Sequence, residues 1–276
     1  AQIRNCDVLC HVIRLFSASE VTHVQGEVDP IRDINVIEAE FALADLGIIE
    51  DQLEDVRTEA RLEGGEAEER LRLLEDLEDR LSEGEHVHPK EFGEAEREWL
   101  GELPLLSTKP ILYVFNVDED TLADSTADDH YQDAIEYIEE ETRSPQVTLS
   151  AQFEVELLGM DPSERPLFLE DYGLEESGLN RLVREAYDLL GLITFFTYNE
   201  NELRAWSLPK GGTAAQAAGK IHSDFRENFI RAETINFEEF KEYRSWTEAR
   251  DDGAVRSRGE DYVIEDGDIL QIHAQA

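Results

Sequence analysis

A short apolar run at residues 111–115 ends abruptly in the polar segment 116–119. A continuous apolar run followed by a turn signal is typical of a strand that is buried on both faces of a parallel sheet. In such sheets, ligands bind just beyond the carboxyl ends of the strands. We therefore expect Asn116 and Glu119 to lie where a small molecule is recognised.

Strands and helices are expected to alternate around this run. Residues 6–16 have the pattern of a buried strand, and Asp29-Pro30 opens a helical pattern that continues through residue 46. Residues 127–141 and 181–190 have helical periodicity, whereas residues 146–149 have the pattern of a strand. This alternation predicts an α/β fold with a parallel sheet and right-handed crossovers.

Residues 47–103 have a different pattern. Apolar residues recur at steps of three and four on both sides of Gly64-Gly65, and charged residues occupy most other positions. This predicts an antiparallel helical hairpin with one apolar seam, inserted between two parts of the sheet. A solvated structural arm is favoured over a catalytic role for this segment.

The pattern changes again from residue 192 onward. Thr213 is a suitable N-cap for a helix through His222, and short strand patterns flank that helix. The strands are expected at residues 193–197, 203–208, 230–235, 262–264 and 269–272. Two strands, a helix and further strands predict a small module of β-grasp type.

The formal charge of −40 is extreme, with 65 acidic residues against 25 basic ones. A charge of this size repels itself and needs counterions. Because the acids are spread along the whole chain and lysine is depleted, we interpret the charge as adaptation to high internal salt. An acidic partner-binding surface is the alternative. In molar salt, the lack of a basic patch does not exclude an RNA partner.

The two cysteines, Cys6 and Cys10, have no second pair and do not indicate a disulfide framework or a zinc site. We expect buried thiols in a reducing cytoplasm. Neither a signal peptide nor an apolar run of about 18 residues is present, so we expect a cytoplasmic protein without a membrane partner. The first residue is Ala1 and the sole methionine is Met160, which we interpret as a missing N-terminal portion.

Several motifs follow one another in the order found in one family of nucleotidases. The segments are Ile3-Arg4 through Arg14, Thr22-His23-Val24 with Gly26 and Pro30, Ile34 to Leu46, Lys109-Pro110, Asn116 to Glu119, Gly173 to Glu176 with Gly178-Leu179-Asn180, Arg204-Ala205-Trp206 through His222, Phe229 to Ala232, Asp261-Tyr262-Val263 and Asp266-Gly267-Asp268. On these segments the whole chain resembles the YchF/Obg-like ATPases, a branch of the Obg-related P-loop nucleotidases.

The resemblance implies that the chain is organised into domains that occupy four ranges of residues. A nucleotidase domain, a P-loop NTPase parallel sheet, would occupy residues 1–46 and 104–191, with its N-terminal part missing. An inserted helical hairpin arm would occupy residues 47–103. A C-terminal TGS domain of β-grasp type would occupy residues 192–276.

The resemblance also implies a base-recognition site. Asn116, Val117 and Glu119 match the motif with which this class recognises the purine, and Ser150 and Ala151 match its second base-contacting loop. Guanine-binding relatives have aspartate where this chain has Glu119, and glutamate at that position accompanies a preference for ATP, with GTP as the alternative. Without the resemblance, these residues form a strand-end turn stabilised by an Asx cap.

His23 matches the histidine that assists hydrolysis in this family, where Mg²⁺ and an in-line water are used; without the resemblance it is a surface residue of a loop. The phosphate-binding loop is not found. Gly212 and Gly219 enclose six residues where the Walker loop needs four, and Ile221 replaces its hydroxyl residue. We therefore expect the Mg²⁺ ligands in the missing N-terminal part, and this chain alone to be inactive.

The TGS resemblance implies binding to RNA, the ribosome or a regulatory ligand, and no DNA partner. Six residues are candidates for a cationic and aromatic surface: Arg204, Trp206, Lys210, Lys220, Arg226 and Arg231. A core position for Trp206 is the alternative. Two functions therefore stay open, an ATPase and a ribosome-binding protein regulated by nucleotide or RNA with little or no turnover.

Overall fold

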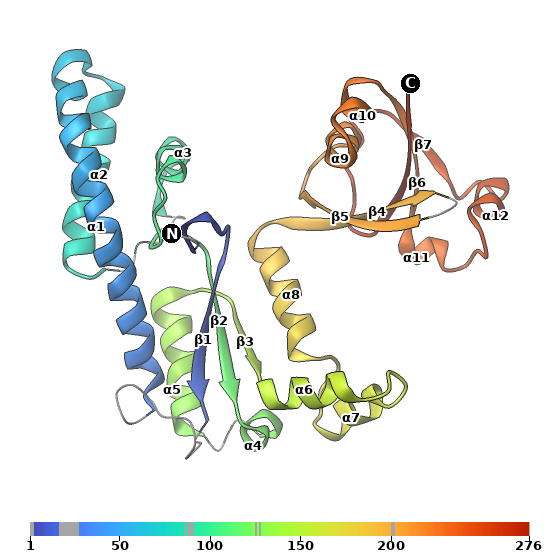
Figure 1. Cartoon of the computed structure of the whole chain (residues 1–276), viewed down its shortest axis with the longest axis horizontal. Coiled ribbons are helices and arrows are strands. Elements are labelled where there is room, and N and C mark those ends of the chain that lie inside the picture. Colours follow the sequence, from blue (N-terminus) through green and yellow to red (C-terminus); the bar gives the residue numbers. More distant parts are fainter. Residues whose placement is uncertain are drawn as a thin grey trace. The chain divides into compact units, whose positions relative to one another are not determined.

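The computed structural model describes residues 3–16, 28–85, 87, 91–124, 126, 128–199 and 202–275. The chain forms two compact units, Ala1–Ala186 and Tyr187–Ala276 (Figure 1). The division falls in the last turns of helix α8 (Gly178–Leu189), just ahead of the predicted limit at residue 192. Within the described ranges, no helix has both the length and the apolarity needed to span a bilayer.

A parallel sheet forms the centre of the first unit. Its strands are β1 (Leu9–Leu15), β2 (Ile111–Val117) and β3 (Gln146–Leu149), in the order β1-β2-β3. Strand β2 is the central strand, and Tyr113 and Phe115 within it are fully buried. The structure thus confirms the predicted α/β fold and the doubly covered strand at residues 111–115.

Strand β1 differs from its prediction. Only one of its faces is buried, through Leu9, Ile13 and Leu15, whereas Val12 on the other face is 61% exposed. β1 is also an edge strand of the sheet formed by the described residues. Both thiols are also exposed, so the prediction that Cys6 and Cys10 are buried is wrong.

The helical arm is built on one long helix. Helix α1 (Pro30–Glu63) begins at Asp29, whose side chain accepts a hydrogen bond from the Arg32 N–H at 3.0 Å. It continues without a break through residues 46 and 47. Helix α2 (Glu66–Ser82) returns along it, and α3 (Glu94–Glu102) follows (Figure 1).

The predicted seam between α1 and α2 is observed. Its buried residues are Ile49, Leu53, Val56, Ala60, Leu73, Leu74, Leu77 and Leu81. Charged side chains cover the opposite faces, as the helical periodicity predicts. Burial of this shared apolar stripe stabilises the hairpin, because isolated helices of this composition gain little from propensity alone.

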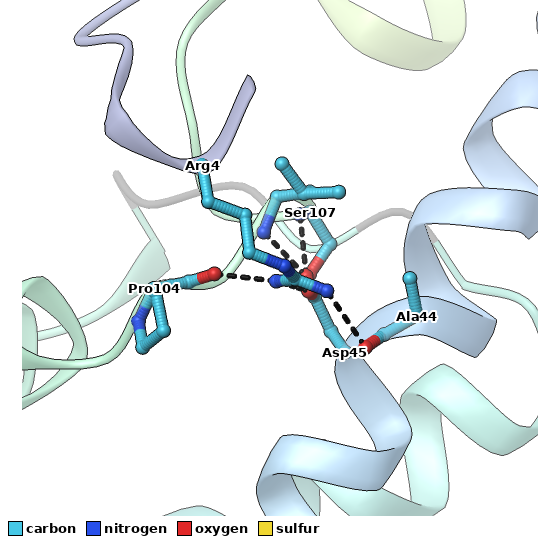
Figure 2. A network of polar contacts seen from close by, with 6 residues as sticks. Arg4, Ala44, Asp45, Pro104 and Ser107 are labelled. Atoms are coloured by element: carbon cyan, nitrogen blue, oxygen red, sulfur yellow. Dashed lines mark hydrogen bonds and ion pairs between the residues drawn. The ribbon is translucent and has the colours of Figure 1, made fainter. Parts of the chain in front are cut away.

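A buried carboxylate fixes the arm to the rest of the unit (Figure 2). Asp45, on α1, is fully buried, and its Oδ2 accepts hydrogen bonds from Leu106 N at 2.6 Å, Ser107 N at 2.7 Å and Ser107 Oγ at 2.8 Å. Its Oδ1 accepts one from Arg4 Nη1 at 2.6 Å, and that guanidinium also donates to the Pro104 carbonyl. Three segments that are distant in sequence thus meet at one side chain.

Further helices complete the first unit. They are α4 (Glu119–Ala123), α5 (Asp129–Tyr137) with a π-helical turn η4 (Ile138–Thr142), α6 (Ala151–Gly159), α7 (Arg165–Asp171) and most of α8. Helix α5 packs Tyr131 and Ala134 against the apolar residues of β1 and β2. The carboxyl ends of β2 and β3 lead directly into α4 and α6.

The second unit contains a mixed five-stranded sheet in the order β5-β4-β8-β6-β7. The strands are β4 (Leu192–Asn199), β5 (Glu202–Pro209), β6 (Phe229–Asn236), β7 (Arg256–Arg258) and β8 (Asp268–Ala274), and β4 and β8 are parallel. The helices are α9 (Ala214–Ile221), α10 (Ser223–Glu227), α11 (Phe237–Phe240) and α12 (Trp246–Asp251). Helix α9 buries Ala214 and Ala217 against the sheet.

One predicted strand of this unit is wrong. Residues 262–264 form only an isolated bridge between Thr213 and Val263. The Tyr262 carbonyl accepts a hydrogen bond from Ala214 N at 2.8 Å, and Ile264 N donates to the Gly212 carbonyl at 2.9 Å. These bonds hold the segment against the start of α9, and the edge strand is β7 instead.

Candidate functional site

The two predicted base-contacting segments lie side by side. Asn116 is near the end of β2, and Ala151 begins α6 directly beyond β3. The Ala151 N–H donates to Asn116 Oδ1 at 2.9 Å. The amide nitrogen of Asn116 forms no hydrogen bond with the described part of the chain, so this side chain is oriented with its donor group unused.

Ser150 and Val117, two of the predicted base-contacting residues, also have a role in the fold. Ser150 is 1% exposed and is the N-cap of α6, because its hydroxyl accepts a hydrogen bond from Phe153 N at 3.4 Å. Val117 is 2% exposed and its side chain belongs to the core. A ligand could therefore meet Val117 through its backbone and not through its side chain.

Glu119 is the first residue of α4. The Asx cap of this turn is made by Asp118, whose carboxylate accepts a hydrogen bond from Thr121 N at 2.9 Å. This leaves Glu119 for other contacts. Its Oε2 accepts a hydrogen bond from the Tyr172 hydroxyl at 3.2 Å. Its Oε1 is buried and has no hydrogen-bond partner among the residues that the structure describes.

Tyr172, which follows α7, is a site residue that sequence reasoning missed. Burial, followed by the hydrogen bond to Glu119, raises its pKa, so the hydroxyl stays a proton donor at neutral pH. Its ring packs edge-on against Phe153, with 4.7 Å between ring centroids, and Phe168 stacks on Phe153 at 4.9 Å. Tyr172 lies 53 residues from Glu119, so no local pattern connects them.

The start of α8 supports the end of β3. Glu154 is buried, and its Oε1 accepts a hydrogen bond from Gly178 N at 2.6 Å. Arg181 Nη2 donates to the Thr148 carbonyl at 2.7 Å. A Cβ atom on Gly178 would lie 2.5 Å from Leu149 Cβ, so only glycine permits this approach. The position of Ser150 and Ala151 therefore depends on α8.

The site has one unused donor, the Asn116 amide, and one unused acceptor, Glu119 Oε1, among the described residues. A buried carboxylate oxygen without a partner is costly, and an exocyclic amine would satisfy Glu119 Oε1. The Asn116 amide can donate to a ring nitrogen. Adenine carries such an amine beside ring acceptors. His23 lies outside the described residues, and within them no cluster of three or more acidic, histidine or cysteine side chains is arranged to hold a metal.

The six candidates for a cationic and aromatic surface in the second unit do not form a single surface in the structure. Arg204 is paired with Glu202 at 2.5 Å and Arg231 with Glu233 at 3.3 Å. Trp206 packs against the core and donates to Thr197 Oγ1 at 2.9 Å, which supports its core alternative. The remaining three side chains line one cavity: Lys210, Lys220 and Arg226. Lys220 lies within α9, whereas the lysine of a Walker loop lies between a strand and the start of a helix.

Similar proteins cover nearly the whole chain. The family model YchF-GTPase_C, described as "Protein of unknown function (DUF933)", matches residues 192–275. The ribosome-binding ATPase YchF of Bacillus subtilis is 38% identical over 270 residues, which are 98% of this chain and 74% of that protein. The ribosome-binding ATPase YchF of Escherichia coli O157:H7 is 38% identical over 268 residues, which are 97% of this chain and 73% of that protein.

A solved structure has the same fold. The structure of the Schizosaccharomyces pombe YchF GTPase matches with a TM-score of 0.83 and 29% identity, over 99% of this chain and 73% of that one. The matches to the bacterial relatives cover 98% and 97% of this chain and therefore include both compact units. The chain belongs to the YchF/Obg-like family.

Proposed function

We propose that this chain carries the adenine-recognising part of a ribosome-binding ATPase. The observation that carries the proposal is the buried Glu119 Oε1, which has no hydrogen-bond partner in the described part of the chain. It lies beyond the carboxyl end of β2, where α/β sheets bind ligands. In a guanine-binding site, the carboxylate accepts from a ring N–H and an amine. The names of the bacterial relatives support the assignment to ATP.

Each residue has a distinct role in this proposal. Glu119 accepts from the exocyclic amine of the base, and Asn116 donates to a ring nitrogen. Ala151 orients Asn116 through its backbone N–H, at 2.9 Å from Oδ1. Val117 contributes its backbone, and Ser150 holds the second loop by capping α6.

Hydrolysis would need groups beyond this site. Mg²⁺, when bound with the phosphates, supplies charge neutralisation, and we propose that His23 orients or deprotonates the attacking water. The Walker pattern is not matched at Gly212, Gly219 and Lys220. We therefore propose that the 276 residues bind the base and do not hydrolyse ATP by themselves.

We further propose that the protein associates with ribosomes in the cytoplasm, with the C-terminal unit as a TGS domain. The bacterial relatives are named as ribosome-binding, which supports the ribosomal partner. The match of residues 192–275 to a family model of its own supports a separate C-terminal module. In a chain of charge −40, contact with RNA would be strongly salt-dependent.

Nucleosides test base recognition directly, because they need no phosphate-binding loop. We expect this chain to bind adenosine more tightly than guanosine in saturation-transfer NMR titrations at constant KCl. Glu119→Gln is expected to weaken adenosine binding by about tenfold, since a neutral acceptor makes a weaker hydrogen bond than a carboxylate does. Guanosine binding should change much less.

Glu136→Gln is the matched control, because Glu136 is an exposed residue of α5. It should leave both nucleoside affinities unchanged. Equal affinities of the unmodified chain for adenosine and guanosine would refute the assignment of Asn116 and Glu119. A loss in the control equal to that in Glu119→Gln would show that net charge, not base contact, is being measured.

Tyr172→Phe tests whether the tyrosine positions Glu119. The substitution keeps the ring in its contact with Phe153 and removes the hydroxyl that donates to Glu119 at 3.2 Å. We expect adenosine to bind roughly fivefold more weakly, corresponding to about 1 kcal/mol for one hydrogen bond. Tyr243→Phe removes a similar bond, to Asp252 at 3.0 Å in the other unit, and should have no effect. If Tyr172→Phe left the ratio of adenosine affinity to guanosine affinity unchanged, the role of Tyr172 would be packing alone.

A further inference from the structure

The C-terminal unit contains a cavity of about 670 Å³ at the end of β5 and along α9 and α10. This volume is in the range of small-molecule sites. The cationic side chains that line it are Lys210, Lys220 and Arg226, and the single acidic one is Glu227. Three of the 25 basic residues of a chain with 65 acidic ones thus surround one cavity.

Acidic residues of the described ranges leave these three cations unpaired. Among the described residues, their side chains form no ion pair or hydrogen bond. Other cations of the same unit are paired, for example Lys241 with Glu238 at 2.6 Å and Arg250 with Glu233. Glu227 lines the cavity without pairing with any of them. Their positive charge is therefore available to a ligand.

The backbone brings the three side chains to one place. Gly212 N donates to the Pro209 carbonyl at 2.9 Å and closes a β-turn, in which Gly211 has φ 87°. A turn with positive φ at its third residue requires glycine, and it leaves Lys210 at the corner. A Cβ atom on Gly219 would lie 3.1 Å from Arg226 Cδ, so the glycine lets the Arg226 stem lie against α9 near Lys220.

The lining distinguishes between kinds of anion. It contains no phenylalanine, tyrosine or tryptophan, whereas sites for single-stranded nucleic acid stack bases on aromatic rings. Lysine and arginine side chains are the usual ligands of phosphate oxygens. Three cations in one cavity match a charge greater than that of one phosphate. The lining therefore favours a compact, multiply charged phosphate group over an RNA strand.

We propose that this cavity binds the phosphate groups of a small ligand that carries two or more phosphates. The overall negative charge repels such a ligand at long range. At high ionic strength that repulsion is screened within a few ångströms, and the direct contacts to Lys210, Lys220 and Arg226 decide the affinity. This inference does not depend on the proposed ATPase function.

Inorganic pyrophosphate is the probe for this site. Calorimetric titration of the chain with pyrophosphate should show one binding site, with weaker binding of orthophosphate. Lys220→Ala and Arg226→Ala should each weaken pyrophosphate binding by about tenfold, as expected for loss of a charge-assisted hydrogen bond. Arg204→Ala and Arg231→Ala remove the same charge outside the cavity and should change the affinity by less than about twofold.

The Glu227→Gln variant distinguishes an effect on the binding site from damage to the fold, because it is expected to strengthen binding. Removing the acidic group of the lining should tighten pyrophosphate binding by about threefold, as expected for loss of like-charge repulsion near a partly screened anion. Affinities that are equal in the Lys220, Arg226 and Arg204 variants would overturn the proposal. So would binding of a short single-stranded RNA that depends on Lys220 and Arg226 while pyrophosphate does not bind.

Discussion

Replacing Asp45 by alanine is expected to lower the free energy of unfolding of the N-terminal unit by about 3–5 kcal/mol, because it breaks a buried ion pair and leaves buried donors unsatisfied. Asp45 is fully buried and accepts hydrogen bonds from Leu106 N, Ser107 N, Ser107 Oγ and Arg4. Alanine removes all of these acceptors at once. The expected loss is a large part of the stability of a typical domain.

Asp45→Asn should cost less than Asp45→Ala. Both carboxylate oxygens face donors, so an asparagine must turn its NH₂ group toward one set of them. Arg4 is 22% exposed in its side chain and can turn to solvent, whereas the N–H groups of Leu106 and Ser107 cannot. The amide will therefore point its oxygen at residues 106 and 107 and give up the contact with Arg4.

The measurement is urea unfolding followed by far-UV circular dichroism, with hydrogen exchange to assign the change to a unit. Asp51→Ala is the matched control, because Asp51 is an exposed residue of the same helix. It should change stability by less than about 0.5 kcal/mol. Protection of β4, β6 and β8 in the second unit should not change in any variant. A loss in Asp45→Ala no larger than in Asp51→Ala would contradict the role given to this carboxylate.

The sequence predicts those parts of the fold whose cause is local. Residues 111–115 are apolar at every position, and they form the strand that is covered on both faces. The seam of α1 and α2 follows from apolar residues at helical spacing. The neighbouring positions of Asn116 and Ala151 follow from the rule that parallel strands end at the same edge of a sheet.

The remaining features depend on pairings that are distant in sequence. Asp45 meets residues 106 and 107 across 61 and 62 positions, and Tyr172 reaches Glu119 across 53. No spacing rule indicates such partners. For the same reason, sequence alone could not show that Arg204 and Arg231 are paired while Lys210, Lys220 and Arg226 share a cavity.

The incomplete burial of β1 and the missing strand at residues 262–264 also have a physical cause. Apolar composition indicates that a segment is buried but not what covers it. Val12 is apolar but lies on the uncovered face of an edge strand, 61% exposed. Ile264 is buried in the second unit's core and Tyr262 packs against it, while their backbone groups bond to residues at the start of α9 and not to a neighbouring strand.

Gly178→Ala is expected to destabilise the N-terminal unit by about 1–3 kcal/mol through overpacking. The new Cβ atom would lie 2.5 Å from Leu149 Cβ and 3.0 Å from Glu154 Oε1, so β3 and α8 must move apart. In a helix interior, alanine is more stabilising than glycine by up to about 1 kcal/mol. Gly178 is the first residue of α8, so little of this gain applies and the overpacking decides the sign.

Gly47→Ala is the control, because it should change stability through helix propensity alone, without overpacking. Gly47 lies inside α1, and nothing within 4 Å would meet its Cβ atom, so this substitution should stabilise the unit by about 1 kcal/mol. Because Leu149 directly precedes Ser150 and Ala151, Gly178→Ala should also weaken adenosine binding, whereas Gly47→Ala should not. If the urea midpoints showed that both substitutions stabilise the unit, the close packing of α8 on β3 would be contradicted. Destabilisation by Gly178→Ala with unchanged adenosine affinity would instead separate this packing from base recognition.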